Sequence, residues 1–191
     1  MVISEQEVMR KTQLTGLLEL ICQALELTKT QFETAEDRYG AVGRWLAEAE
    51  SPLIETATVY PQGSMSLGTT VKPLGRNEFD IDLVCHTPRG KQYMEPSALK
   101  KLIGDRLRTN ERYRPILEEK PRCWRLNYAG DFHLDITPTI PNPACRRGGE
   151  LAPDKKLKEW KETNPQGYKD WFEQLAAIPV RFVVADAFAA N

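Results

Sequence analysis

The first quarter of the chain has apolar residues at helical spacing, which predicts two helices. Residues 4–28 form the first, and Ser4 followed by Glu7 has the pattern of a capping box. Residues 31–48 form the second, which Ser51-Pro52 ends because the residue before proline disfavours helical backbone. The apolar positions are Val8, Leu14, Leu17, Leu18, Ile21 and Leu25, then Phe32, Ala35, Tyr39, Val42 and Leu46. We expect both helices, within residues 1–50, to pack on the core.

Alternation of apolar and polar residues predicts two strands in the middle of the chain. Successive side chains of a strand point to opposite faces of a sheet. In FDIDLV, Asp80 and Asp82 therefore share one face, and the apolar residues share the other. In FHLDIT, Asp135 lies on the polar face together with His133. Each strand is expected to bury one face and to show carboxylates on the other.

The remaining segments complete an α+β pattern around a small mixed sheet. The stretch LIETATVY is rich in β-branched residues and predicts a short strand that leads into Pro61. The segment TPTIPNPACRRGGE, with three prolines and two glycines, is expected to be loop. Further predictions are a helix at 95–108, strands at 122–128 and 131–137 joined by a tight turn at Ala129-Gly130, and a helix that starts at Asn164-Pro165. Its stripe of Tyr168, Trp171, Phe172 and Leu175 is expected to pack in the core, and residues 180–191 receive no assignment.

Composition narrows the class of protein. The chain has 191 residues, a formal net charge of −1 and 41% hydrophobic residues, which is ordinary for a globular domain. The near-neutral charge argues against a protein that wraps nucleic acid. The four cysteines are scattered without a C-x-x-C pair, so zinc-finger spacing is absent. No signal peptide or apolar span of ~20 residues is present, and we expect a cytoplasmic protein with reduced thiols.

The acidic positions point to metal chemistry if the two alternating strands are neighbours. Asp80, Asp82 and Asp135 would then converge, and three adjacent carboxylates repel one another unless cations neutralise them. Two Mg²⁺ or Mn²⁺ ions in such a site clamp an in-line displacement at phosphorus. An acid on the wet face of a strand is commonplace, however, and a lone D-x-D is usually structural.

The Gly-Ser element ahead of the first acidic strand changes this balance. Gly63 has no Cβ, so the backbone can turn tightly and approach a ligand closely. Ser64 can open a short helix and offer a hydroxyl and backbone N–H groups to a phosphate. A Gly-Ser turn alone is more often only a turn. Followed by D-x-D on one strand and an aspartate on another, it becomes a specific pattern.

The motifs QGSMSLGT, FDIDLV and LDIT resemble those of the polymerase-β-like nucleotidyltransferase superfamily. Within it the chain is most similar to the bacterial cGAS/DncV-like nucleotidyltransferases, the CD-NTases of CBASS anti-phage systems, over about residues 60–172. The resemblance implies a nucleotidyltransferase core at 51–178 and a helical domain that closes over the nucleotides. Residues 179–191 are expected to begin that helical domain, most of which lies beyond the chain, so activity of this chain alone is in doubt.

The resemblance also implies roles for individual residues. Asp80 and Asp82 are expected to bind both Mg²⁺ or Mn²⁺ ions, with Asp135 completing the site. Gln62, Gly63 and Ser64 are expected to hold the donor triphosphate. Attack of a ribose hydroxyl on the α-phosphorus would expel pyrophosphate, and repetition would give a cyclic di- or trinucleotide second messenger. The expected partners are NTPs and possible CBASS regulatory or effector proteins, with no membrane and no nucleic acid.

Several other functions share parts of this pattern. A template-independent RNA nucleotidyltransferase has the same metal site, and a haloacid-dehalogenase-type phosphatase or a glycosyltransferase also uses D-x-D. A catalytically idle binding module of the same fold is the alternative outside enzymes. The segment 100–125 holds nine basic residues against four acids, and a solvated face is the favoured interpretation.

Overall fold

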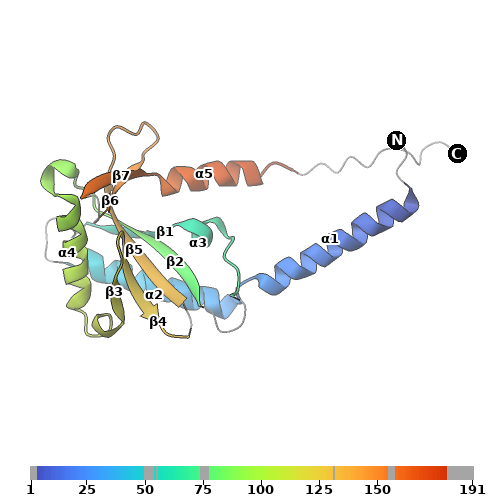
Figure 1. The fold of residues 1–191 in the computed structure, drawn as a ribbon, viewed down its shortest axis with the longest axis horizontal. Helices are drawn as coiled ribbons and strands as arrows, with labels where there is room; N and C mark the ends of the chain where they lie inside the picture. The colour runs from blue at the N-terminus through green and yellow to red at the C-terminus, as the bar shows by residue number, and fades with distance from the viewer. Residues whose placement is uncertain are drawn as a thin grey trace.

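The computed structural model describes residues 4–49, 54, 56–73, 78–130, 132–154 and 158–179. These residues form an α+β fold in which helices flank one mixed sheet (Figure 1). The strands are β1 (Thr58–Pro61), β2 (Phe79–His86), β3 (Leu117–Glu119), β4 (Trp124–Tyr128), β5 (Phe132–Pro141), β6 (Glu150–Asp154) and β7 (Glu159–Thr163). The helices are α1 (Glu5–Leu25), α2 (Lys29–Ala47), α3 (Gly63–Leu67), α4 (Pro96–Arg108) and α5 (Pro165–Ala176), with 3₁₀ turns η1 (Lys91–Tyr93) and η2 (Arg114–Ile116).

Strand β5 lies at the centre of the sheet and sets its topology. The strand order is β1-β2-β5-β4-β3, and β6 extends the sheet from the last residues of β5 to β7. β5 runs parallel to β2 and antiparallel to β4. The two acidic strands of the sequence are therefore direct neighbours, which is the condition under which the three aspartates were expected to converge.

The apolar face of these strands builds the core. Phe79, Ile81 and Leu83 of β2 are buried, as are Phe132 and Leu134 of β5. Helices α2 and α4 cover this face with buried residues at helical spacing. On these helices the fully buried side chains are Ala35, Val42, Leu46, Leu99, Ile103 and Leu107. The opposite, polar face of the same strands is left for α3 and α5.

The two N-terminal helices behave differently. α2 packs on the core, and a complete capping box at Thr28 and Gln31 starts it. Ser4 caps α1 by accepting the Glu7 N–H at 3.3 Å, but no side chain of α1 is buried, and the helix projects away from the sheet (Figure 1). The expectation that both helices pack on the core is therefore wrong for α1, whose apolar residues are interspersed with charged ones around the helix.

The proline-rich segment expected to be loop is partly strand. β5 continues to Pro141, and β6 starts at Glu150, so only residues 142–149 are loop. Proline removes one ladder donor and is tolerated where a strand lacks a second neighbour. Pro138 meets this condition, because β4 pairs with β5 only as far as Ile136 and β6 first pairs at Ile140.

The aromatic stripe of α5 is exposed rather than buried. Asn164 caps the helix by accepting the Gly167 N–H at 2.9 Å, as the sequence indicates. Tyr168 and Trp171 are 54% and 52% exposed, and Phe172 is half-buried. The expectation of core packing is wrong for this stripe, since few elements of the described chain face α5.

Some sequence-based predictions fall outside the described residues. These are the helix stop at Ser51-Pro52, the strand positions Leu53 and Glu55, the strand start at Asp131 and the segment 180–191. Among the described helices, none is both long enough and apolar enough to cross a membrane. All four cysteines are free thiols.

Candidate active site

The register of β2 and β5 brings the three predicted aspartates together. Asp82 and Asp135 are directly paired across the parallel ladder, and Asp80 lies two residues earlier on the same face of β2. Neighbouring strands are about 4.8 Å apart, so the Asp82 and Asp135 side chains leave adjacent points of one face. Asp80 is exposed, whereas Asp82 and Asp135 are half-buried.

The Gly-Ser element lies against this carboxylate face. The Gln62 N–H donates to the backbone oxygen of Asp82 at 2.8 Å. Gly63 has a φ of +60°, and a Cβ added there would stand 3.1 Å from Asp82 Oδ2. Only glycine combines this backbone conformation with so close an approach. The structure thus places Gln62 and Gly63 against the acidic strand, as predicted, and Ser64 follows them in α3.

Ser64 is held in place by the segment that follows α3. Thr69 donates its N–H to the Ser64 backbone oxygen at 2.9 Å, and Thr70 Oγ1 donates to Ser64 Oγ at 3.0 Å. Because Thr70 supplies the proton of that bond, the Ser64 hydroxyl keeps its own proton for another acceptor. Such a donor suits a phosphate oxygen.

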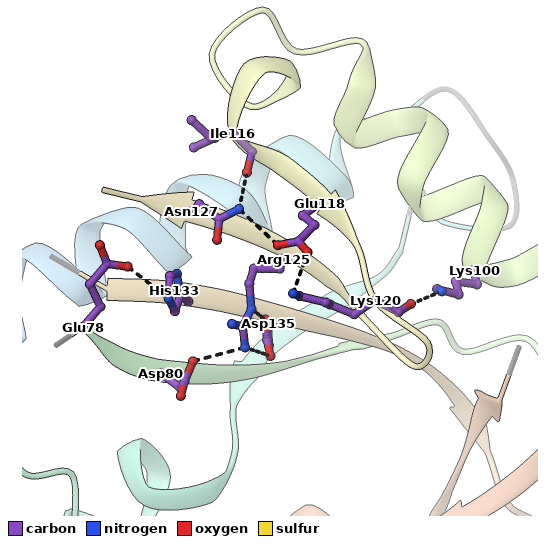
Figure 2. Close-up of polar contacts among 10 residues, drawn as sticks. All are labelled: Glu78, Asp80, Lys100, Ile116, Glu118, Lys120, Arg125, Asn127, His133 and Asp135. Carbon is purple, nitrogen blue, oxygen red and sulfur yellow. Dashed lines mark hydrogen bonds and ion pairs between the residues drawn. The ribbon is translucent and has the colours of Figure 1, made fainter. Parts of the chain in front are cut away.

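Arg125 of β4 is the functional candidate that the sequence analysis did not single out. Its Nε donates to Asp135 Oδ1 at 2.6 Å and its Nη2 to Asp135 Oδ2 at 2.7 Å, a bidentate pair (Figure 2). Nη2 also reaches Asp80 Oδ1 at 3.2 Å. The hairpin register places Arg125 directly opposite Asp135. The spacing of the hairpin could have indicated that Arg125 pairs with Asp135, but only if the length of the turn between β4 and β5 were known.

The electrostatics of the site follow from this crowding. The pKa of Asp82 is raised above its usual value by burial first, then by the charges of Asp135 and Asp80, while Arg125 opposes the shift. The bond to Asp135 raises the pKa of Arg125, which stays charged. The carboxylates thus carry more negative charge than one guanidinium offsets.

The donor set of the site is chemically suited to a hard divalent cation, but Arg125 shares it. Three carboxylates on one face offer the oxygen ligands that Mg²⁺ and Mn²⁺ prefer. Among the described residues, however, no group of three or more His, Cys, Asp or Glu side chains is arranged so that it could hold a metal ion. Two of the three aspartates bind Arg125 instead.

His133 lies beside the site. It is opposite Asp80 in the register and pairs with Glu78 at 3.0 Å (Figure 2).

Many side chains of the basic segment 100–125 form ion pairs. Within the basic segment the pairs are Lys100–Glu119, Lys101–Asp105, Arg108–Asp105 and Lys120–Glu118, besides Arg125–Asp135. The interpretation as a merely solvated face is therefore too simple.

A second polar cluster lies further along the same face. The Tyr60 hydroxyl donates to Glu150 Oε1 at 2.5 Å, and His86 Nδ1 lies 3.3 Å from the same oxygen. The three residues line a pocket of about 300 Å³ that Asn142 and Gln166 also border. Glu150 is only 7% exposed, so the cluster ties β1, β2 and β6 together below α5.

Comparison with known proteins defines the class. The family model of the Second Messenger Oligonucleotide or Dinucleotide Synthetase domain (SMODS) matches residues 13–175. In structure, the chain is similar to the CD-NTase CdnG of Bradyrhizobium diazoefficiens in complex with GTP, with a TM-score of 0.64 and 29% identity over 78% of this chain and 42% of that one. It shares the fold of Escherichia coli DncV, with a TM-score of 0.61 and 16% identity over 79% of this chain and 58% of that one. The fold is therefore the polymerase-β-like nucleotidyltransferase fold of the CD-NTases.

Curated relatives agree with this class. A c-di-GMP synthase of Roseivirga ehrenbergii is 39% identical over 168 residues, which are 87% of this chain and 44% of the relative. The cyclic dinucleotide synthase CdnG of Bradyrhizobium diazoefficiens is 36% identical over 160 residues, 79% of this chain and 37% of the relative. The chain thus spans less than half the length of either protein. It belongs to the SMODS family of CD-NTases.

Proposed function

We propose that the chain forms the nucleotide-binding and catalytic face of a nucleotidyltransferase that joins NTPs into a cyclic dinucleotide. One observation carries the proposal: the register that pairs Asp82 with Asp135, with Gly63 in contact distance of Asp82. A phosphate grip and a carboxylate cluster are the two parts that phosphoryl transfer needs, because its catalysis is mostly positioning and charge stabilisation. Since two relatives are named for c-di-GMP and cyclic dinucleotide synthesis, we propose GTP as one substrate.

The proposed cofactor is a pair of Mg²⁺ or Mn²⁺ ions held by Asp80, Asp82 and Asp135. The all-oxygen donor set fits such ions. Burial first, and then the charges of Asp135 and Asp80, raise the pKa of Asp82, and a bound cation would offset those two charges. When bound, they would lower the pKa of the acceptor hydroxyl and offset charge on the phosphate oxygens.

The chain's own residues would bind and orient the substrate. Ser64 donates its hydroxyl proton to a phosphate oxygen, and the tight turn at Gly63 lets the triphosphate approach the backbone. The Gln62 side chain borders the same turn, while its N–H is already used by Asp82. The ribose hydroxyl of a second nucleotide then attacks the α-phosphorus in line and pyrophosphate leaves. On the family resemblance we further propose a role in anti-phage defence, with regulatory or effector proteins as partners.

The test is nucleotide binding and turnover by the 191-residue chain. Each NTP is titrated in Mg²⁺, Mn²⁺ or EDTA, and the products are treated with phosphatase and separated. We expect GTP binding that requires the cation and is lost in the Asp80→Asn, Asp82→Asn double variant, whose fold circular dichroism monitors. Cation-independent binding, or equal binding by the double variant, would contradict the metal assignment.

Product analysis separates the proposed reaction from its rivals. A phosphatase-resistant product indicates cyclisation, a lengthening ladder indicates an RNA nucleotidyltransferase, and free phosphate alone indicates a phosphatase. Binding without turnover fits the short span of this chain, because the relatives are more than twice as long as the matched region. Loss of Asp135 should lower any turnover by more than the roughly 10- to 100-fold seen when a residue that only orients a metal ligand is removed.

A further inference from the structure

Arg125 is fixed beside the carboxylates by the sheet itself. It stands directly opposite Asp135 in the antiparallel β4–β5 ladder, and side chains of such pairs start about 5 Å apart. The Arg125 side chain is 22% exposed and that of Asp135 is 15% exposed, so water screens their attraction only partly. No rearrangement of the backbone is needed for the guanidinium to reach the acidic face.

The guanidinium uses the oxygens that a divalent cation would need. Nε and Nη2 engage both carboxylate oxygens of Asp135 at 2.6 and 2.7 Å. Nη2 extends to Asp80 at 3.2 Å and so bridges two strands (Figure 2). A planar guanidinium engages both oxygens of a carboxylate edge to edge. Cation and Arg125 cannot hold these same lone pairs at once.

We propose that Arg125 is a built-in competitor of the divalent cation. It holds Asp135 and Asp80 together when no cation is bound, and it must release them before Asp80, Asp82 and Asp135 can share an ion. This inference deepens the proposed function and rests on its assignment of the three aspartates. It also explains why these aspartates lie close together, although no three acidic, His or Cys side chains among the described residues are arranged to hold a metal ion.

Competition between Arg125 and the cation couples binding of the cation to binding of the nucleotide. A nucleoside triphosphate with its bound cation delivers both a replacement ligand for the carboxylates and a new anionic partner for the freed guanidinium. Free cation supplies only the first of these. Arg125 therefore penalises binding of the bare ion more than binding of the ion together with a triphosphate.

The experiment measures Mn²⁺ affinity without nucleotide, by the electron paramagnetic resonance signal of free Mn²⁺. It compares the wild-type chain with Arg125→Gln, Arg125→Lys and, as a matched control, Arg108→Gln, which removes an arginine from an exposed pair with Asp105. We expect Arg125→Gln to bind Mn²⁺ roughly ten-fold more tightly, since loss of a charge-assisted bond is worth about one decade. Arg125→Lys should fall between, because one ammonium cannot engage both oxygens, and Arg108→Gln should match the wild type.

A second measurement follows the fold in EDTA. Arg125→Gln should unfold at lower denaturant concentration than the wild type, and saturating Mn²⁺ should remove most of that difference. Should Arg125→Gln prove insoluble, Arg125→Lys carries the comparison. Unchanged or weaker Mn²⁺ binding by the Arg125 variants overturns the inference, since the arginine would then orient the carboxylates for the ion. In that case wild-type binding that Asp82→Asn abolishes leaves the proposed function intact. No Mn²⁺ binding by any variant overturns both.

Discussion

Asp82 differs from the other two carboxylates in its surroundings. Asp135 and Asp80 each accept hydrogen bonds from Arg125, whereas Asp82 faces Gly63 and has both acids as neighbours. Burial and these two charges raise its pKa, so ionised Asp82 is less favourable in the folded than in the unfolded chain. The residue that we place at the centre of the chemistry therefore costs stability at neutral pH.

The stability consequence has a definite sign. A carboxyl whose pKa is raised by folding contributes stability below its unfolded pKa of about 4, and this contribution is lost as the pH rises through the folded pKa. In EDTA, Asp82→Asn should therefore raise the free energy of unfolding at pH 7, with a gain that shrinks toward zero as the pH approaches 4. Denaturant unfolding at several pH values measures this.

The matched control is Asp37→Asn on the exposed face of α2, which should show no such pH-dependent gain. An Asp82→Asn chain that is less stable than the wild type at pH 7 would mean that ionised Asp82 is stabilised by its surroundings.

At the scale of elements, the turn into α3 joins the proposed phosphate-binding residues to the acidic strand. Gly63 and Gly68, at the two ends of the α3 region, both have positive φ, of +60° and +67°. A Cβ at Gly63 would press on Asp82 Oδ2, whereas one at Gly68 would meet nothing within 4 Å. Substitution of Gly68 would therefore strain only the backbone, whereas substitution of Gly63 would strain the backbone and also crowd Asp82.

Alanine at either glycine should cost about 1–2 kcal/mol of unfolding free energy, because left-handed backbone is unfavourable for residues with a Cβ. Only Gly63→Ala should also weaken Mn²⁺ binding, by several-fold, since its methyl displaces the Asp82 carboxylate. Denaturant unfolding and Mn²⁺ titration measure the two effects. Equal Mn²⁺ affinity in Gly63→Ala and Gly68→Ala would contradict the close contact as a functional one.

The sequence predicts correctly those features that follow from a simple repeat along one element. It does not predict features that depend on the register between two strands. The two acidic faces follow from alternation alone, and the Gly-Ser turn follows from its residue types. Arg125 was missed because a two-residue turn at Ala129-Gly130 would pair it with Leu134, on the buried side, whereas the structure pairs it with Asp135. A shift of one residue reverses every face of a strand.

Short strands were missed for a related reason. β3 has three residues and β6 contains Pro153, so neither carries enough alternation to be recognised. Both form only because a neighbour offers them a ladder, β4 in one case and β5 with β7 in the other. Which strand pairs with which is decided by the tertiary structure, and the local sequence pattern does not reveal it.

At the scale of the whole molecule, the chain consists of a packed core and two apolar surfaces outside it. α1 has exposed Leu17, Leu18 and Leu20, and α5 has exposed Tyr168 and Trp171. Both helices were correctly predicted, but their apolar residues were wrongly taken as evidence of burial in the core. The family relatives are more than twice the length of the matched region.

The same leucine-to-alanine substitution in α2 and in α1 tests whether α2 belongs to the packed core and α1 lies outside it. Leu46→Ala in α2, where the side chain is 0% exposed, should cost about 2–5 kcal/mol of unfolding free energy. Leu18→Ala in α1, where it is 53% exposed, should change it by less than about 0.5 kcal/mol. Denaturant unfolding of the 191-residue chain measures both. A comparable loss at Leu18 would mean that α1 docks on the core in solution.

The parallel pairing of β2 with β5 has a consequence for biosynthesis. Asp82 and Asp135 meet only when β5 has inserted between β2 and β4, although the residues of β2 and β4 are translated earlier. A nascent chain that carries Asp80 and Asp82 but not yet β5 has two of the three aspartates and lacks the pair between Arg125 and Asp135. The proposed nucleotide site can therefore form only after β5 has been translated and has paired with β2.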